Sequence, residues 1–198
     1  MATIYDLKPK FQALLRPIVT TLADKGITPN QVTYAALILS IGMGLLIYLT
    51  QGALWTLLLV PIFMFIRMAM NAIDGILAKE FDMKTKAGAI LNELSDVVSD
   101  AVLYLPLAIV IGVNPLWVIL FVMMGIFTEV AGILAQTISG VRAYHGPMGK
   151  SDRAFVFGLI CLLLGFGLAP LWWVDALLIT SSLLAGLTIY KRAKSALI

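Results

Sequence analysis

The amino-acid sequence predicts an all-α integral membrane protein with six transmembrane helices preceded by an amphipathic interfacial helix. Three observations support this fold class. Of the 198 residues, 61% are hydrophobic and only 13% are charged, whereas about a quarter of the residues in a soluble domain are charged. Six apolar runs reach the length of roughly 20 residues that crosses a bilayer. The basic residues gather in one set of connections between these runs.

The first segment, residues 1–26, is predicted to lie in the membrane interface as an amphipathic helix. It carries too many charges for a cleaved signal peptide. Basic residues stand between apolar residues that recur at helical spacing, namely Ile4, Leu7, Phe11, Leu14, Leu15, Ile18 and Leu22.

The six predicted spans take up most of the remaining chain. Turn-forming pairs such as Gln51-Gly52 and Asn114-Pro115 separate them. No repeat or linker interrupts the series, so residues 1–198 are predicted to form a single membrane domain. The spans are about 32–50, 53–78, 87–112, 115–138, 153–170 and 172–190.

The distribution of basic residues predicts the orientation. If the N-terminus is cytoplasmic, every Lys and Arg except Arg67 falls in a cytoplasmic segment. We therefore expect a multi-pass protein of the bacterial cytoplasmic (inner) membrane with both termini in the cytoplasm. The net charge of +3 then faces membrane lipids and phosphorylated substrates, which argues against a nucleic-acid-binding protein.

Polar residues inside the second and third predicted spans indicate a metal site on the cytoplasmic side. Asn71 and Asp74 share one face of the second span, and Asn92, Asp96 and Asp100 share one face of the third. The short basic connection makes these spans antiparallel neighbours, so their polar faces can meet. Carboxylate and amide oxygens without Cys or His favour Mg²⁺ or Mn²⁺.

The same residues resemble the signature of a known family. The chain reads Asn71-x2-Asp74-Gly75-x2-Ala78-Lys79-x8-Gly88-x3-Asn92-x3-Asp96. This is similar to D-x2-D-G-x2-A-R-x8-G-x3-D-x3-D, the signature of the CDP-alcohol phosphatidyltransferases, with the same spacing throughout. It resembles a variant bacterial branch of that family, with Asn at two of the four acidic positions.

The resemblance implies transfer of a phosphatidyl-type group from a CDP-linked lipid to a small alcohol, with release of CMP. It implies that Asp74 and Asp96, together with Asn71 and Asn92, bind the metal, and that Asp96 also acts as general base. Asp100, one turn beyond Asp96, is a further candidate ligand from geometry alone. The residues implied to contact the cytidine diphosphate are Asp74, Gly75, Ala78, Lys79 and Gly88.

A compact loop before the fifth span carries candidate residues for the acceptor. Gly146–Arg153 leads into a predicted helix, a place where anions bind readily. By resemblance, Arg142, Lys150 and Arg153 would bind a phosphorylated acceptor such as glycerol phosphate or inositol phosphate. The rule that basic residues stay cytoplasmic explains these three residues equally well.

Two other functions stay open from the sequence. Asn71, Asn92 and Lys79 differ from the family signature, and asparagine binds cations without adding charge. A catalytically weak or inactive relative that binds CDP-lipid is therefore one alternative. A small transporter is the other, because buried polar residues can mark an ion path. The sequence also leaves a homodimer open.

Several further residues have structural interpretations. We expect Arg67 to pair with Glu129 or Asp100 inside the membrane. The lone Cys161 is expected to be a small buried residue. The small residues Ala36, Ser40 and Gly44 are expected to form a packing ridge.

Overall fold

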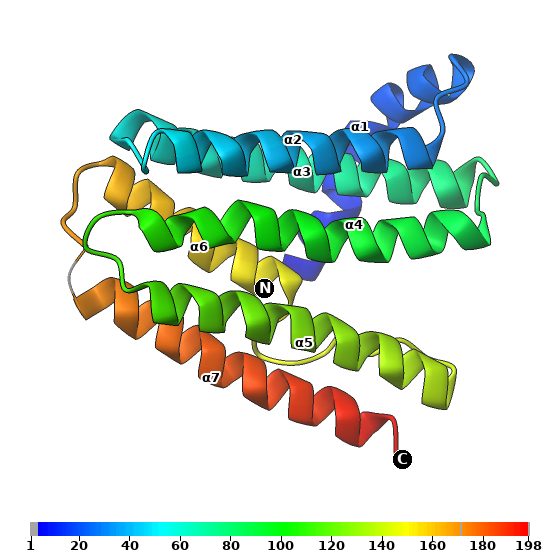
Figure 1. The fold of residues 1–198 in the computed structure, drawn as a ribbon. Coiled ribbons are helices and arrows are strands. Elements are labelled where there is room, and N and C mark those ends of the chain that lie inside the picture. Colours follow the sequence, from blue (N-terminus) through cyan, green and yellow to red (C-terminus); the bar gives the residue numbers. More distant parts are fainter. Residues whose placement is uncertain (1–3, 171, 198) are drawn as a thin grey trace. The chain divides into compact units, whose positions relative to one another are not determined.

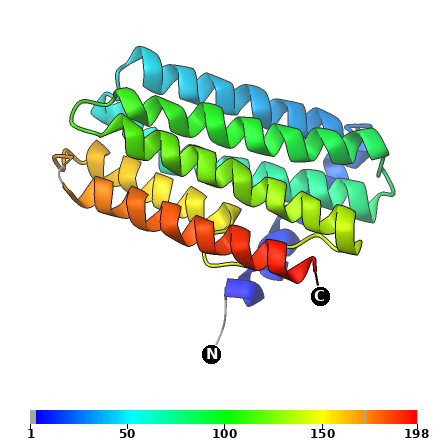
Figure 2. The same cartoon turned by 60° about the horizontal axis from the view of Figure 1, so that its bottom comes forward.

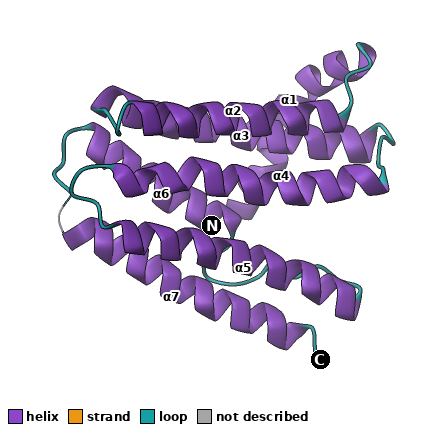
Figure 3. Ribbon diagram, in the orientation of Figure 1, coloured by secondary structure: helices purple, strands orange, loops and turns teal. Residues whose placement is uncertain are grey.

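The computed structural model describes residues 4–170 and 172–197, with side chains described from residue 11 onward. The described residues form helices joined by short loops and contain no strand (Figure 1, Figure 3). The helices are α1 (Ile4–Asp24), α2 (Pro29–Leu49), α3 (Leu54–Glu80), α4 (Lys86–Tyr104), the 3₁₀ helix η1 (Leu105–Ile109), α5 (Pro115–Ser139), α6 (Lys150–Gly165) and α7 (Trp172–Ser195).

Four of these helices, α2, α3, α5 and α7, are long and apolar enough to cross a membrane. The third and fifth predicted spans correspond to α4 and α6. Helix α4 has 19 residues and includes several acidic ones, and α6 has only 16 residues, fewer than the roughly 20 that span a bilayer. Membrane crossing by α4 and α6 stays a prediction.

The α-helix in the third predicted span ends earlier than the span was expected to end. The α-helix ends at Tyr104 and the chain continues as η1 rather than reaching residue 112. Pro106 lies in the first turn of η1, and its ring nitrogen has no hydrogen to donate to the preceding helical turn. The α-helix therefore ends before the predicted span does, and the limits of the third span stay a prediction.

The chain divides into two compact units. Unit 1 comprises Met1–Ile41 and Phe63–Ser99, and unit 2 comprises Gly42–Ile62 and Asp100–Ile198. The sequence positions of the boundaries fall inside α2, α3 and α4. The expectation of a single domain stays a prediction.

In unit 1, one face of α1 packs against α3. Leu15 and Val19 of α1 are buried together with Ile73 and Leu77 of α3. Leu14 lies next to them in the sequence but is 73% exposed. Helix α1 therefore has a packed apolar face and further apolar side chains on its surface, which suits the predicted position in a lipid interface.

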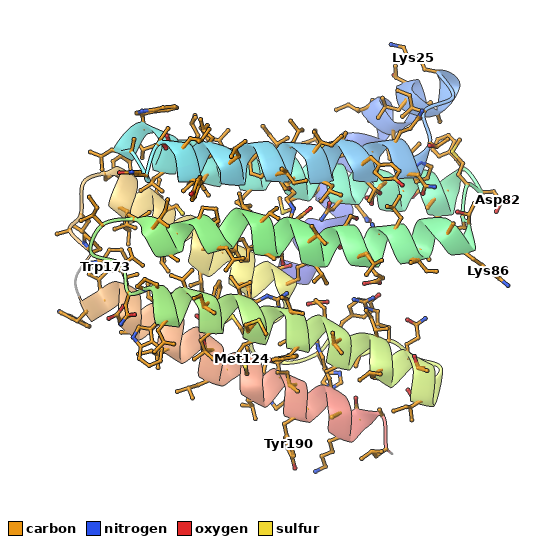
Figure 4. The ribbon with its side chains drawn as sticks, in the orientation of Figure 1. Lys25, Asp82, Lys86, Met124, Trp173 and Tyr190 are labelled. Atoms are coloured by element: carbon orange, nitrogen blue, oxygen red, sulfur yellow. The ribbon has the colours of Figure 1, made fainter. Side chains whose placement is uncertain are left out.

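In unit 2, α5 and α7 run side by side in the same direction (Figure 1, Figure 2). The small residue Gly186 faces α5, because a Cβ at that position would lie 3.5 Å from Cε of Met124. Figure 4 shows Trp173 near the start of α7 and Tyr190 near its end. The two helices thus form a pair in which both N-termini lie at the same end.

Close packing in unit 2 also joins α2 to α4. A Cβ added to Gly44 would collide with the backbone carbonyl of Val102, whereas Gly42 has no atom within 4 Å of the same position. Gly44 therefore allows the two helix backbones to approach closely. This observation agrees with the packing role expected for the small-residue ridge.

Candidate active site

The polar faces of α3 and α4 meet in unit 1 through two crossed hydrogen bonds. Asn71 Nδ2 of α3 donates to Asp96 Oδ1 of α4 at 3.2 Å. Asn92 Nδ2 of α4 donates to Asp74 Oδ2 of α3 at 3.3 Å. Each helix therefore supplies one amide and one carboxylate, and the structure brings together the four motif residues that the sequence predicts.

Helix α2 contributes a third group, Thr33, which sequence reasoning missed. Its hydroxyl oxygen lies 2.9 Å from Asp74 Oδ2 and 3.1 Å from the carbonyl oxygen of Pro29. Thr33 and Asp74 are both buried, with 6% and 4% of their surface exposed. In the sequence, Thr33 is a polar residue in the second turn of an apolar helix, and it ends a segment, residues 26–33, that resembles the family's usual lead into its first span.

Arg67 lies one helical turn before Asn71 on α3 and is also buried. One of its guanidinium nitrogens donates to the backbone carbonyl of Asp96 at 3.4 Å. A buried guanidinium group therefore lies against the backbone of Asp96.

The glycines of the motif have different surroundings. A Cβ on Gly75 would have no atom within 4 Å, so open space lies beside this residue. A Cβ on Gly88 would lie 2.7 Å from Asn30 Oδ1 and 2.8 Å from Thr85 Oγ1. Gly75 thus leaves room for a ligand close to the backbone, whereas the space at Gly88 is filled by protein side chains.

The end of α3 and the start of α4 carry exposed charges. Ala78 is half-buried and Lys79 is exposed. Figure 4 shows Asp82 projecting outward from the connection between the two helices, and Lys86 projecting outward from the start of α4. A negatively charged ligand near Gly75 would therefore have an exposed cation, Lys79, about one helical turn away.

The oxygen donors of unit 1 fit a hard divalent cation. Asp74 and Asp96 offer carboxylate oxygens, and Asn71 and Asn92 can offer amide oxygens if their amide groups rotate. Within the part of the chain that is described, no group of three or more His, Cys, Asp or Glu side chains is placed to hold a metal ion. The oxygen donors that α3 and α4 offer here are thus two carboxylates and two amides.

A second charged cluster lies in unit 2 around Glu129 of α5. Arg142, from the loop after α5, donates to Glu129 Oε2 at 3.1 Å. Arg153, in the first turns of α6, donates to Glu129 Oε1 at 2.9 Å. All three side chains are at most 10% exposed, so two of the three predicted acceptor-binding residues converge on one buried carboxylate.

Arg192 of α7 joins this cluster and was not predicted as part of a site. It donates to the backbone carbonyls of Thr128, Tyr144 and His145. Its Nη1 also lies 3.7 Å from Glu129 Oε1. Arg192 therefore fastens the loop between α5 and α6 to α5 and α7.

Arg153 has further partners within unit 2. It donates to Thr128 Oγ1 at 2.6 Å, and it lies 3.6 Å from Asp100 Oδ2. Asp100 is thus an ionic partner of Arg153, and this contact does not support the predicted metal-ligand role. Lys150, the third predicted acceptor-binding residue, is the first residue of α6 and is half-buried.

The partners of Glu129 differ from the sequence expectation. The sequence suggested Arg67 as a partner of either Glu129 or Asp100. Arg142 and Arg153 instead donate to the two carboxylate oxygens of Glu129. The sequence places Arg142 in a loop and Arg153 at the start of a helix. Spacing along the chain does not show that the loop between α5 and α6 folds back toward α5.

The guanidinium of Arg142 lies over the ring of Tyr144, 5.1 Å from its centroid. Burial lowers the pKa of Arg142 from its ordinary value, and this effect exceeds that of Tyr144, which acts in the opposite direction. Because burial disfavours the charged form, an anion bound beside Arg142 would offset part of that cost.

Comparisons with known proteins show which family the sequence resembles. The family model for CDP-alcohol phosphatidyltransferase matches residues 26–187. The chain is 48% identical to the inner membrane protein YnbA of Escherichia coli K12 over 198 residues, covering 99% of this chain and 97% of that protein. It is 30% identical to the phosphatidylinositol phosphate synthase of Corynebacterium glutamicum over 104 residues, 52% of this chain and 45% of that protein.

Solved structures show a similar fold at lower sequence identity. The phosphatidylinositol phosphate synthase of Mycobacterium tuberculosis with CDP-DAG bound has a TM-score of 0.76 and 18% identity, covering 91% of this chain and 92% of that one. The same enzyme in complex with manganese and citrate also has a TM-score of 0.76 and 18% identity, with coverage of 91% and 88%.

Proposed function

Because the chain belongs to the CDP-alcohol phosphatidyltransferase family, a class of transferases of phospholipid biosynthesis, we propose that it transfers a phosphatidyl group from CDP-diacylglycerol to an alcohol and releases CMP. The main observation behind this proposal is that Asp74 and Asp96 lie on the facing sides of α3 and α4. Each of them accepts a hydrogen bond from an amide of the opposite helix. These residues occupy acidic positions of the family signature.

The proposed reaction is an attack of the acceptor hydroxyl on the phosphorus that bears the lipid. The new oxygen–phosphorus bond forms as the bond to the CMP phosphate breaks. Asp96 accepts the proton of the attacking hydroxyl, as a positioned general base can do. The donor's acyl chains stay in the inner leaflet of the membrane.

Asp74 and Asp96, with Asn71 and Asn92, are the residues that would hold Mg²⁺ or Mn²⁺. Such a cation supplies charge neutralisation for the diphosphate and stabilises the leaving phosphate oxygen. The solved structure of the mycobacterial synthase with manganese supports this choice of metals.

The protein groups that would bind the cytidine diphosphate lie around the end of α3. Gly75 has open space beside it, so a phosphate can approach the backbone. Lys79 is exposed and offers a positive charge, although lysine lacks the two-pronged geometry of the family arginine. Ala78 is proposed to line the same region. Gly88 is proposed to lie at its edge, where the side chains of Asn30 and Thr85 fill the space next to the glycine.

The proposed acceptor carries a phosphate, as glycerol phosphate and inositol phosphate do. Arg142, Lys150 and Arg153 would bind this phosphate. The supporting observation is the concentration of buried guanidinium groups around Glu129 in unit 2, where three arginines face two carboxylates. An additional anion would improve the charge balance of this cluster.

In the membrane, we propose six crossings, with α4 and α6 completing the four apolar helices, and both termini in the cytoplasm. The predominantly basic cytoplasmic segments support this orientation. Helix α4 carries acidic residues on its polar face, which suits a helix that faces the protein interior rather than lipid. The site then lies on the cytoplasmic side.

The direct test is CMP release by the purified protein with CDP-diacylglycerol and Mg²⁺ or Mn²⁺. Acceptors are supplied in matched pairs, namely glycerol phosphate with glycerol and inositol phosphate with inositol. We expect release with one phosphorylated acceptor, little with its unphosphorylated partner, and none with excess chelator. Binding of CDP-diacylglycerol without CMP release from any acceptor would instead identify a non-catalytic relative.

A further inference from the structure

Each carboxylate of the proposed active site accepts a hydrogen bond from an asparagine of the opposite helix. Asn71 donates to Asp96 at 3.2 Å, and Asn92 donates to Asp74 at 3.3 Å. An ionised carboxylate only accepts hydrogen bonds, so each amide presents its NH₂ group when no cation lies between the two side chains. Amide hydrogens therefore supply positive partial charge at positions where two further carboxylates would have added negative charge.

The charge of this group matches one divalent cation. Asp74 and Asp96 together carry two negative charges when ionised, which equals the charge of a single Mg²⁺ or Mn²⁺. Two such cations about 3.5–4 Å apart would repel each other about four times as strongly as two unit charges, because the energy follows the product of the charges. Two carboxylates neutralise only half of that pair.

The surroundings make a second cation still less favourable. The buried Arg67 donates to the backbone of Asp96 at 3.4 Å and adds positive charge. No third acidic residue in the described part of the chain comes together with Asp74 and Asp96 as a metal-binding group. Glu93 is adjacent to Asn92 in sequence, but neighbouring helical residues point about 100° apart.

A single cation has enough ligands in this site. Mg²⁺ is often held by one or two carboxylates together with substrate phosphates and water. Asp74 and Asp96 provide the carboxylates, and the diphosphate of the donor provides further oxygens. Thr33, whose hydroxyl lies 2.9 Å from Asp74 Oδ2, can orient that carboxylate.

We infer that this site binds one divalent cation per chain rather than two. The uncharged amides of Asn71 and Asn92 stand where a second cation would need two further carboxylates. The inference rests on the proposed function for the identity of the site. In this arrangement Asp100 forms an ion pair with Arg153 and is not a metal ligand.

The test is a titration of the purified protein in lipid nanodiscs, containing CDP-diacylglycerol, with Mn²⁺ followed by electron paramagnetic resonance. We expect one bound Mn²⁺ per chain and a spectrum without coupling between manganese ions. The double variant Asn71→Asp, Asn92→Asp should bind two Mn²⁺ ions and show coupling. Asn114→Asp, at the helix cap of α5 outside the site, is the matched control and should still bind one.

Wild-type stoichiometry alone decides the inference, even if the double variant fails to fold. Two coupled Mn²⁺ ions per wild-type chain, or no bound Mn²⁺, would overturn it. CMP release measured on the same samples tests the proposed function separately. One bound Mn²⁺ without CMP release refutes the function and keeps the inference, whereas two ions with CMP release refute the inference and keep the function.

Thermal unfolding supplies a second readout. Without metal, the double variant should melt at a lower temperature than wild type, because it gains two negative charges and loses two cross-helix hydrogen bonds. Added Mn²⁺ should raise its melting temperature more than that of wild type, since bound ligand stabilises the folded state. Equal Mn²⁺-induced shifts in the two proteins would contradict the inference.

Discussion

At the scale of single residues, Asp74 and Asp96 differ in ways that suit different roles. Asp74 is 4% exposed and receives hydrogen bonds from Asn92 and Thr33. Asp96 is only half-buried and receives a bond from Asn71. Donors to a carboxylate stabilise its ionised form, so Asp74 is suited to hold a cation. The more accessible Asp96 is suited to accept a proton from a substrate.

Replacing Asp96 with Asn should lower the rate of CMP release by about 100-fold or more, the range expected for loss of a general base. The asparagine keeps the size of the side chain but cannot accept the proton. Asp82→Asn is the matched control, because Asp82 is exposed in the connection between α3 and α4 with a backbone φ of 54° that asparagine also adopts. Full activity of Asp96→Asn would show that another group removes the proton.

Replacing Thr33 with Val should destabilise the protein by about 1 kcal/mol and weaken Mn²⁺ binding, while the β-branched shape is retained. The variant removes the hydroxyl that lies 2.9 Å from Asp74, and a buried acceptor that loses a partner costs about 1–3 kcal/mol. Thr33→Ser should recover both properties. Thr20 of α1 is exposed, and its hydroxyl donates to the carbonyl of Arg16 in the same helix, so Thr20→Val should change neither property. Equal losses in the two Val variants would contradict a specific role for Thr33.

At the scale of helices, the contact between α2 and α4 depends on the absence of one side chain. Gly44→Ala should destabilise the protein, because the new methyl group would collide with the backbone of Val102 and backbone atoms cannot move aside easily. Gly42→Ala in the same helix meets no atom within 4 Å and should be neutral or stabilising by up to about 1 kcal/mol. Melting temperatures of the two variants, compared in one detergent, give the check.

The loop between α5 and α6 depends on Arg192 of α7 in a similar way. Arg192→Lys should destabilise the protein by about 2 kcal/mol and raise protease cleavage in the loop, since lysine cannot reach the carbonyls of Thr128, Tyr144 and His145 at once. Arg16→Lys is the control. Its exposed ion pair with Glu80 contributes roughly 0–1 kcal/mol to stability. If Arg16→Lys lost as much stability as Arg192→Lys, the loss would come from replacing any arginine with lysine and not from the contacts of Arg192.

Helix positions were predictable from the sequence, but several ends and partners were not. Apolar runs located α2, α3, α5 and α7, because lipid-facing and core-facing residues are both apolar. The end of α4 was missed because Pro106 interrupts an apolar run that continues past it. The partners of Asp74 and Glu129, namely Thr33 and Arg142, come from other elements, and spacing along one helix carries no information about them.

At the scale of the whole molecule, the basic residues predict the side of the membrane on which each connection lies. Cysteines introduced at Lys84 and Lys150 should react with an impermeant maleimide only after the membrane is opened, because both positions are predicted to be cytoplasmic. The native Cys161 is fully buried, so its background labelling should be low. A cysteine at Asn114 is the control and should react in intact cells; labelling at Lys84 in intact cells would reverse the orientation.

The fastening of the loop by Arg192 also has a consequence for biosynthesis. The ribosome completes α5 and the loop well before it reaches α7, yet the carbonyls of Tyr144 and His145 receive their hydrogen bonds from Arg192. The nascent loop therefore cannot reach its final conformation until α7 has left the ribosome. A chain released before α7 is made would carry Arg142 and Arg153 without the hydrogen bonds from Arg192. The proposed acceptor site is therefore one of the last parts of the protein to assemble.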